Sequence, residues 1–339
     1  LDKNGNVKIN QKKWKYNIFQ RNIGEGYRLK LKNLKARNED ELINSNHKDL
    51  ASSVQKVFNQ IGSNFSTNIF KKNNFKNLCL AGGVAQNIVM NQSIFKNSGF
   101  SNIFIQPASS DAGLSLGAAL LELNKNKFFI KKENFNVCLG KNFTNSEVKT
   151  VLDRYQLKYK FVKKIYKIAA EIIANGNIVG WFQGKAEFGP RALGSRSILA
   201  DPRKKNIASI VNKKIKFRET FRPFAPSILE EEFDKFFINS PKCPYMLFRS
   251  EVKEKMRCKI PGVTHVDGSA RPQLVSKKMY PLFWKLINYF NELTKIPVLL
   301  NTSFNLNKEP IVNSPINAVE CFLNSGLDYL IIENFVVKK

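Results

Sequence analysis

Apolar and polar positions alternate along the chain with two different periods. Apolar residues at helical spacing between positions 50 and 61 predict a helix over about 47–72. Short apolar runs predict strands at 77–81, near 103, at 177–182, at 297–300 and at 329–337. Further helices are predicted to start at 84 and at 144, and to cover 112–123, 282–293 and 315–323. A separate helix is predicted to end near 175. Strands that alternate with helices in both halves predict a mixed α/β (α+β) fold.

Residues typical of helix N-termini define where three of these helices begin. Thr144 and Glu147 form a capping-box pattern, Pro281 suits a first helical turn, and Ser314 precedes Pro315 at another start. Residues 1 to about 45 are polar and irregular, with a hairpin-like Asn4-Gly5 pair. The Lys- and Asn-rich stretch 124–133 is the predicted linker between two domains.

Length and composition limit the class of protein. The 339 residues suffice for two domains, and no apolar run reaches the roughly 18 residues of a membrane span. The polar N-terminus is not a signal peptide, and because it lacks an initiator Met we expect the sequence to begin within a longer protein. The 5 cysteines show no CxxC pairing, which favours reduced thiols and a cytoplasmic location over a cysteine zinc site.

The formal net charge of +28 has two interpretations. It could attract nucleic acid, anionic metabolites or membranes. It could also reflect a lysine- and asparagine-rich composition, since the lysines are dispersed as single residues. We favour the second interpretation for most of the charge, and expect a functional role only for the arginines clustered after position 184.

The stretch GWFQGKAEFGPRALGSRSILADPR (180–203) carries the strongest chemical pattern. It begins as an apolar strand and continues as a loop in which glycines and a proline alternate with Lys185, Arg191, Arg196 and Arg203. Glycines expose backbone N–H groups, and several cations fixed around one point suit a phosphate. A solvated basic turn is the alternative interpretation.

This stretch resembles the O-carbamoyltransferases of the nodulation-protein U and cephalosporin carbamoyltransferase type. The resemblance continues through LCLAGGVAQN (78–87), SSDAGLSLGAAL (109–120), IKFRETFRPFAPSIL (215–229), THVDGSARPQLV (264–275) and PVLLNTSFNLNKEPIV (297–312). It implies that residues 1–123 are the C-terminal part of an actin-like (ASKHA) ATPase domain. It also implies that 134–339 form a YrdC-like α/β domain.

The resemblance implies a set of site residues in the second half. Catalytic roles fall to Lys185, Arg191, Arg196, Ser303 and Asn305, where cations hold the phosphate and polar groups orient the carbamoyl. From the residues alone, NTSFN (301–305) could also be a polar turn after a buried strand.

Four further residues are expected to bind substrate: Arg218, Arg222, His265 and Arg271. The two arginines at 218 and 222 would share a helix face, although Pro223 argues that a helix ends there, and surface ion pairs involving Glu219 are an alternative. His265 with Asp267 two residues further on does not form a catalytic triad. A purely structural role for His265 is the alternative.

In the first half, Gly82, Gly83, Asn87 and Asp111 are the expected cofactor-binding residues. The glycine pair lies between a strand and a helix start, a place where N–H groups bind anions, although such pairs also serve packing. Asp111 is either the N-cap of the 112–123 helix or, by the resemblance, a ligand of a divalent metal (Fe or Mg). Two family histidines in an HxxxH-like motif have no counterpart, since His47 and His265 are the only histidines.

The resemblance implies an ATP-dependent O-carbamoyltransferase. Carbamoyl phosphate would be hydrolysed in the YrdC-like half, the carbamate adenylated by ATP to carbamoyl-adenylate, and the carbamoyl passed to a hydroxyl of a sugar or secondary metabolite. The partners would be these small molecules, with no membrane and no specific nucleic acid, and a homodimer is compatible with this. The alternatives are a tRNA threonylcarbamoyl-type enzyme and a non-catalytic anion- or RNA-binding remnant.

Overall fold

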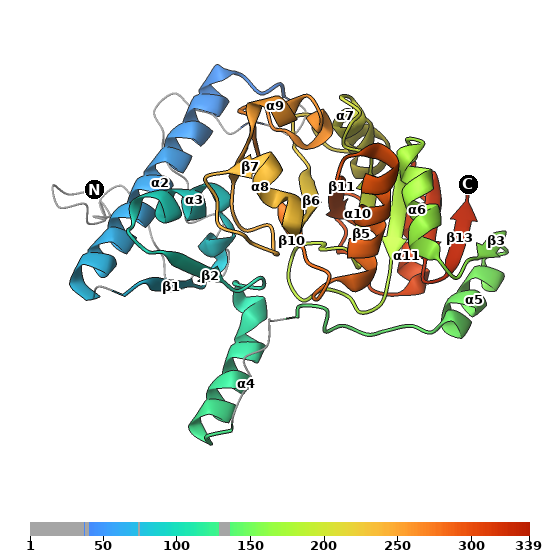
Figure 1. Cartoon of the computed structure of the whole chain (residues 1–339), viewed down its shortest axis with the longest axis horizontal. Helices are drawn as coiled ribbons and strands as arrows, with labels where there is room; N and C mark the ends of the chain where they lie inside the picture. Colours follow the sequence, from blue (N-terminus) through green and yellow to red (C-terminus); the bar gives the residue numbers. More distant parts are fainter. Residues whose placement is uncertain (1–36, 38–40, 74, 129–135) are drawn as a thin grey trace. The chain divides into compact units, whose positions relative to one another are not determined.

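The computed structural model describes residues 37, 41–73, 75–128 and 136–339, and confirms the predicted mixed α/β fold (Figure 1). The chain divides into two compact units. One contains the described residues up to 77 together with 89–102, and the other contains 78–88 and 103–339. The predicted Asn4-Gly5 hairpin lies outside the described residues.

The first unit is built on two helices. Helix α2 (Ser45–Asn73) confirms the predicted helix, and α3 (Ile88–Asn97) lies against it. The two approach closely at Gly62, where an added Cβ would meet Met90 Cγ at 2.8 Å. Asn77–Leu80 (β1) and Asn102–Ile105 (β2) pair in a two-stranded sheet, as the apolar runs predicted, and all but the first residue of each strand belongs to the second unit.

Two predicted helix starts in this part of the chain were wrong. The stretch after Gly82 forms a 3-10 turn (Gly83–Gln86), and the regular helix begins only at Ile88. Asp111 opens a second 3-10 turn (Asp111–Gly113), and α4 (Leu114–Lys125) follows it. Gly82, the residue before this 3-10 turn, has a positive φ of 98°, a conformation that favours glycine.

An eight-stranded mixed sheet forms the core of the second unit, in the order β10-β6-β11-β5-β4-β12-β13-β3. Its strands, in chain order, are β3 (Tyr159–Phe161), β4 (Val179–Phe182), β5 (Arg196–Ala200), β6 (Ala225–Leu229), β10 (Gln273–Val275), β11 (Val298–Ser303), β12 (Tyr329–Ile332) and β13 (Phe335–Lys338). The pairs β10–β6 and β12–β4 are parallel, while β4–β5, β5–β11 and β11–β6 are antiparallel.

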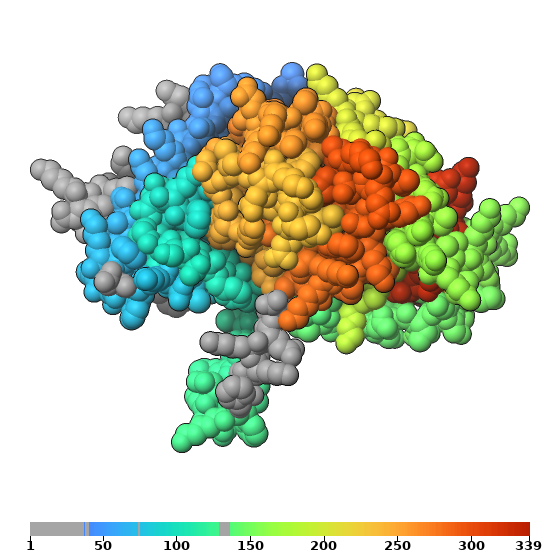
Figure 2. All heavy atoms as spheres, viewed as in Figure 1, coloured from blue at the N-terminus to red at the C-terminus, as the bar shows by residue number. Residues whose placement is uncertain are grey.

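Helices cover this sheet because its strands are apolar on both faces. Helices α6 (Ile165–Ala174) and α10 (Pro281–Thr294) pack on each other, and α11 (Pro315–Leu323) packs on β12, β4 and α5 (Asn145–Arg154). The capping box at Thr144, the proline at the start of α10 and the helix start at Ser314 are confirmed, and Ser314 also forms a capping box that was not predicted. The yellow-to-orange residues of about 225–300 form one continuous packed surface (Figure 2).

Shorter elements complete the second unit. They are α7 (Ile207–Val211), a π-helical turn (Asn212–Lys216), a 3-10 turn (Glu230–Glu232), α8 (Phe233–Phe236), a 3-10 turn (Pro261–Val263), α9 (Glu254–Arg257) and a small sheet of β7 (Phe237–Ile238), β8 (Ser250–Val252) and β9 (Ser269–Ala270).

The prediction of one strand over 329–337 was wrong. Glu333, with φ 46°, turns the chain between β12 and β13, which pair as an antiparallel hairpin. Arg218 and Arg222 do not lie on a helix, in agreement with the argument from Pro223. Phe217 adopts a left-handed conformation at the end of the π-helical turn, and this stops the helix before either arginine.

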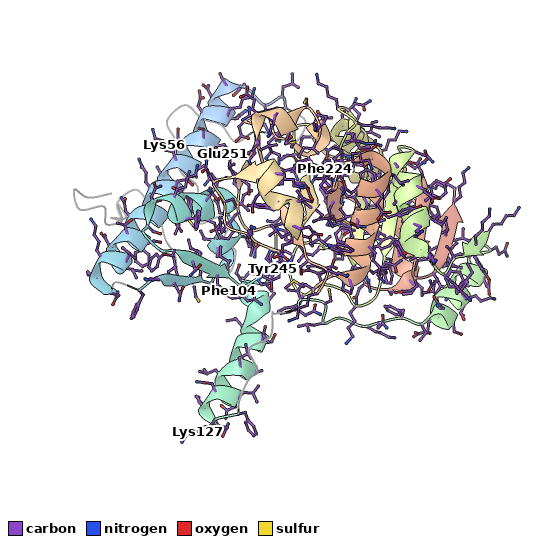
Figure 3. All side chains as sticks on the ribbon, in the orientation of Figure 1. Lys56, Phe104, Lys127, Phe224, Tyr245 and Glu251 are labelled. Atoms are coloured by element: carbon purple, nitrogen blue, oxygen red, sulfur yellow. The ribbon has the colours of Figure 1, made fainter. Side chains whose placement is uncertain are left out.

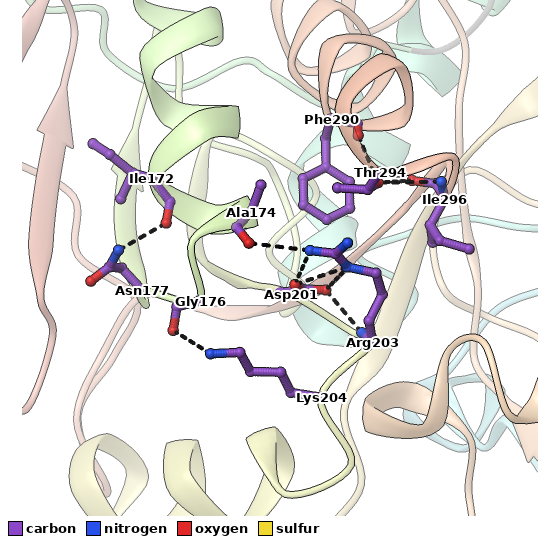
Figure 4. Close-up of polar contacts among 10 residues, drawn as sticks. All are labelled: Ile172, Ala174, Gly176, Asn177, Asp201, Arg203, Lys204, Phe290, Thr294 and Ile296. Atoms are coloured by element: carbon purple, nitrogen blue, oxygen red, sulfur yellow. Dashed lines mark hydrogen bonds and ion pairs between the residues drawn. The ribbon is translucent and has the colours of Figure 1, made fainter.

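Arg203 ties this unit together rather than binding a ligand. Its guanidinium donates to both carboxylate oxygens of Asp201, at 2.6–3.0 Å, and to the Ala174 carbonyl at the end of α6 (Figure 4). It also lies over the ring of Phe290, 5.5 Å from the centroid. One arginine of the predicted basic cluster is therefore a clamp between β5 and two helices.

Candidate functional site: an acid-free arginine cavity

The second unit contains a cavity of about 290 Å³ beside the ends of β6 and β11. Phe224, labelled in Figure 3, lines it immediately before β6. Five basic side chains face it, and no Asp or Glu is among its described lining residues: the basic ones are Arg191, Arg218, Arg222, His265 and Arg271. Four arginines around one space with no carboxylate form a site for a multiply charged anion.

The loop between β4 and β5 places Arg191 in the cavity. Strands β4 and β5 are antiparallel, so residues 183–195 form the connection of a long hairpin. Glu187 folds this connection back on itself, because its Oε1 accepts the backbone N–H groups of Leu193 (2.7 Å) and Ser195 (2.6 Å). Gly189, with φ 126°, precedes Pro190 and lets the loop turn outward just before Arg191.

Of the four arginines that line the cavity, Arg191 and Arg271 have no partner in the described structure. In the part of the chain that the structure describes, neither guanidinium has a hydrogen-bond or ion-pair partner, and Arg191 Nε is fully buried. Burial lowers the pKa of both groups, and the neighbouring Arg191 and Arg218 help to lower that of Arg271 to about 9. Buried, unpaired and mutually repelling cations cost stability unless an anion joins them.

The other two arginines are held at the opening. Arg218 Nε donates to Asn212 Oδ1 at 2.7 Å, and its guanidinium lies 5.0 Å from the centre of the Phe224 ring. Arg222 Nε lies 2.9 Å from Glu219 Oε2, and both side chains are about half exposed. The surface ion pair considered for Glu219 is thus present, with Arg222 as its partner, while both arginines still line the cavity.

Lys216 was missing from the predicted site. Its buried Nζ donates to Ser303 O (2.6 Å), Ser303 Oγ (3.2 Å), Asn305 O (3.0 Å) and Asn305 Oδ1 (2.6 Å). Burial, and then the charge of Arg218, lower the pKa of Lys216 to about 7. An ammonium group that loses or gains its proton near neutral pH lies directly behind the predicted Ser303 and Asn305.

Ser303 and Asn305 are brought together as predicted. Ser303, the last residue of β11, lines the cavity, and its hydroxyl donates to Asn305 Oδ1 at 2.7 Å. Asn305 also donates to the Glu309 carbonyl at 2.6 Å, which closes the loop after the strand. Residues 301–303 belong to the strand, so the alternative of a simple polar turn does not hold for them.

Lys185 and Arg196 do not face this cavity. Arg196 is fully buried in β5, where it donates to the carbonyls of Gln183, Gly184 and Ser195 and stacks 3.5 Å from the centre of the Phe182 ring. Lys185 is exposed and lines a different hollow of about 420 Å³ with Cys138 and Tyr280. The predicted convergence of these two residues with Arg191 is therefore absent, because Arg196 is buried within β5 and Lys185 lies in the connection beside another hollow.

His265 lies at the edge of the cavity, and burial lowers its pKa. Ser269 Oγ is 3.5 Å from His265 Nδ1, and the same hydroxyl donates to Asp267 at 2.5 Å. Asp267 pairs with Arg249 instead of orienting the imidazole, as expected from the absence of a triad pattern.

A second hollow of about 450 Å³ shares four lining residues with the arginine cavity: Arg222, Pro223, Phe224 and His265. It is more apolar, and two exposed side chains line it. Phe221 is 67% exposed, and Val266 is exposed beside it. An open aromatic ring next to an anion site suits the flat face of a base or another ring.

The predicted cofactor residues of the first half lie in turns. Gly82 and Gly83 are exposed, and nothing lies within 4 Å of a Cβ added at either, so the backbone there is open to a ligand. Asn87 ends the 3-10 turn rather than lying one turn into a helix. Asp111 is the first residue of its 3-10 turn, with Ser110 at the capping position, so it is not an N-cap.

The described residues do not form a metal site. No group of three or more His, Cys, Asp or Glu gathers among them, and Asp111 is exposed. A single carboxylate does not hold a transition metal, which takes three or more protein ligands. No step is therefore assigned to a metal.

Sequence similarity identifies the family of the chain. A family model described as the carbamoyltransferase C-terminus matches residues 170–339, and one described as the carbamoyltransferase N-terminus matches residues 1–120. The chain belongs to the carbamoyltransferase family. Among the described residues, no helix is both long and apolar enough to cross a membrane.

Several proteins are similar to the chain. Nodulation protein NolNO of Sinorhizobium fredii is 39% identical over 331 residues, covering 96% of the chain and 48% of that protein. An uncharacterized protein of Synechocystis is 41% identical, covering 86% and 52%, and nodulation protein U of Rhizobium tropici is 35% identical, covering 68% and 39%. The chain spans about half the length of the curated relatives it matches.

Among solved structures, HypF of T. kodakarensis matches 57% of the chain at 18% identity, with a TM-score of 0.34. That value is too low to establish a shared fold.

Proposed function

We propose that the chain provides the carbamoyl-phosphate site of an ATP-dependent O-carbamoyltransferase. The observation that carries this proposal is the acid-free cavity in which Arg191 and Arg271 have no partner, within the part that matches the carbamoyltransferase C-terminus. In this proposal residues 1–123 belong to an actin-like (ASKHA) domain, 124–133 to a linker and 134–339 to a YrdC-like domain.

The arginines would bind the phosphate of carbamoyl phosphate. Water attacks the carbamoyl carbon, the carbon–oxygen bond to the phosphate breaks, and carbamate, inorganic phosphate and a proton leave. Arg191 and Arg271 neutralise the charge on the departing phosphate, and Arg218 and Arg222 close the opening. Lys216 holds Ser303 and Asn305 in place and adds a charge that depends on pH.

The carbamate would then react with ATP. Its oxygen attacks the α-phosphorus, pyrophosphate leaves, and carbamoyl-adenylate forms. The apolar hollow around Phe221 is the proposed place for the adenine, since it shares Arg222 and His265 with the arginine cavity. The arginines left free by the departing phosphate can bind the phosphates of ATP.

The carbamoyl group would finally pass to a hydroxyl of a sugar or another small metabolite, with release of AMP. This transfer belongs to the actin-like domain, in which Gly82, Gly83, Asn87 and Asp111 are the proposed nucleotide-binding residues. A small-molecule acceptor is part of this proposal and follows from the resemblance to O-carbamoyltransferases. Because the chain spans about half the length of the curated relatives it matches, transfer is proposed for the whole protein.

The test is phosphate release from carbamoyl phosphate. Arg271→Ala should reduce release at least tenfold, while Arg154→Ala, which removes the same charge from the exposed surface of α5, should leave it unchanged. Equal release by wild type and Arg271→Ala would contradict the placement of the site.

A further inference from the structure

Three buried polar side chains form a cluster beneath the arginine cavity. Ser227, Gln273 and Asn301 come from the neighbouring strands β6, β10 and β11, and none is more than 1% exposed. Ser227 Oγ donates to Gln273 Oε1 at 2.6 Å. Asn301 Nδ2 lies 2.9 Å from Ser227 Oγ and 3.1 Å from Gln273 Oε1. Of the three, only Asn301 also lines the cavity.

These contacts fix the orientation of the Asn301 amide. Its nitrogen faces the Gln273 oxygen and, at 3.3 Å, the Ala192 carbonyl, and an oxygen in that place would be repelled by both. Asn301 Oδ1 therefore points the other way. It is buried, and in the described structure it has no hydrogen-bond donor. A buried acceptor without a donor is costly, and a ligand N–H that reaches it removes the cost.

The cluster also holds Asn301 against the connection between β4 and β5 that carries Arg191. Gln273 Nε2 donates to the Leu193 carbonyl at 2.7 Å, and Asn301 Nδ2 contacts the Ala192 carbonyl, directly after Arg191. One rigid network therefore sets both the free acceptor and the unpaired arginine. A ligand whose phosphate meets Arg191 would present its other end at a defined place on the cavity wall.

The cavity is otherwise rich in donors. Its arginines only donate, and the Ser303 hydroxyl donates to Asn305 while accepting from Lys216. In carbamoyl phosphate, the phosphate and carbonyl oxygens accept hydrogen bonds, and the amide nitrogen carries the only N–H donors. We propose that Asn301 Oδ1 accepts a hydrogen bond from this amide nitrogen, so that Asn301 selects carbamoyl phosphate over other acyl phosphates.

This assignment rests on the proposed function and adds its specificity. Acetyl phosphate has nearly the same shape, with a methyl group in place of the amide, and would leave Asn301 Oδ1 buried and unpaired. A site built to pair a polar group rejects the analogue that lacks it more strongly than an apolar pocket rejects a size change. We expect discrimination of about ten- to a hundredfold in kcat/KM from this contact.

The experiment compares phosphate release from carbamoyl phosphate and acetyl phosphate by wild type, Asn301→Leu and Ser227→Ala. Asn301→Leu removes the acceptor, and the ratio of the two kcat/KM values should fall at least tenfold. Ser227→Ala disturbs the same buried network but keeps Oδ1, so the ratio should stay within about twofold of wild type, even if both rates fall. A purely structural role would lower both rates in both variants and leave the ratio constant.

Calorimetry with inorganic phosphate distinguishes a failure of the role proposed for Asn301 from a failure of the proposed function. If phosphate binds all three proteins and the ratio is unchanged in Asn301→Leu, the role of Asn301 is wrong and the proposed function stands. If wild type neither binds phosphate nor releases it from either compound, the proposed function itself is wrong. A collapse of the ratio in Ser227→Ala as large as in Asn301→Leu would also overturn the assignment to Oδ1.

Discussion

Arg191 and Arg196 lie five positions apart on the same hairpin, yet their environments are opposite. Arg196 is fully buried and meets three backbone carbonyls and the ring of Phe182. Arg191 reaches the cavity and has no partner in the described structure. The comparison shows that a cluster of arginines in the sequence does not identify a ligand site. An arginine is free for a ligand only when the protein leaves its donors unused.

The first and largest expected effect concerns stability. Arg196→Ala should lower the free energy of unfolding by about 3 kcal/mol, because three carbonyl groups lose a charged donor inside the core. Arg191→Ala should not lower it, since Arg191 has no contact of this kind to lose and its removal relieves the repulsion with Arg271. Urea denaturation of both variants measures the difference. Equal destabilisation would remove the distinction between the two residues.

The second effect concerns phosphate binding, for which Arg191 matters more than it does for stability. Arg191→Ala should weaken phosphate binding about ten- to a hundredfold, because one charge-assisted hydrogen bond to the anion is lost. Arg154→Ala is the control for the general loss of one positive charge. Calorimetry with inorganic phosphate measures both, and a loss of affinity that is the same in the two variants would point to a non-specific charge effect.

The third prediction uses the pH dependence of Lys216. Its pKa is lowered to about 7, so the side chain is charged below that pH and neutral above it. The affinity for sulfate, which stays a dianion throughout, should fall severalfold as the pH rises from 6 to 8. Lys216→Arg keeps the charge and should flatten the curve. Burial lowers the pKa of His265, which moves the titration of its imidazole away from neutral pH.

The smallest effect is expected at Lys185. The sequence pattern predicted a catalytic role, but this lysine is exposed and lines another hollow. Lys185→Ala should therefore change phosphate affinity by less than about twofold, in line with the weak effect of a distant exposed charge. A tenfold loss would return Lys185 to the site and would require the basic loop to move on binding.

These contrasts show which parts of the molecule could be predicted from sequence. The capping box at Thr144, the α2 helix and the β4 strand depend on residues close in the chain, and the pattern predicted them correctly. Strands β5, β6 and β10 escaped prediction. Arg196 opens β5, Pro226 interrupts β6 and a glutamine opens β10, so these segments do not read as continuous apolar runs.

Part of the candidate site was also predictable, because it depends on residues that lie close together in the sequence. Arg191, Ser303 and Asn305 follow from motifs, and the structure brings Ser303 and Asn305 together. Lys216 could not be distinguished in sequence from the exposed Lys213 and Lys214, since only the π-helical turn buries one of the three. Tertiary contacts also decide that Arg196 donates to three carbonyls, with only its Nε left without a partner, whereas Arg271 has no partner in the described structure.

The most direct test of the central claim is a crystal structure of the protein grown with selenate, a tetrahedral dianion whose selenium is located by anomalous scattering. The arginine cavity should contain selenate within hydrogen-bond distance of Arg191 and Arg271, with Arg196 still bound to its three carbonyls. An empty cavity, with the anion at Lys185 or on dispersed surface lysines, would contradict the account.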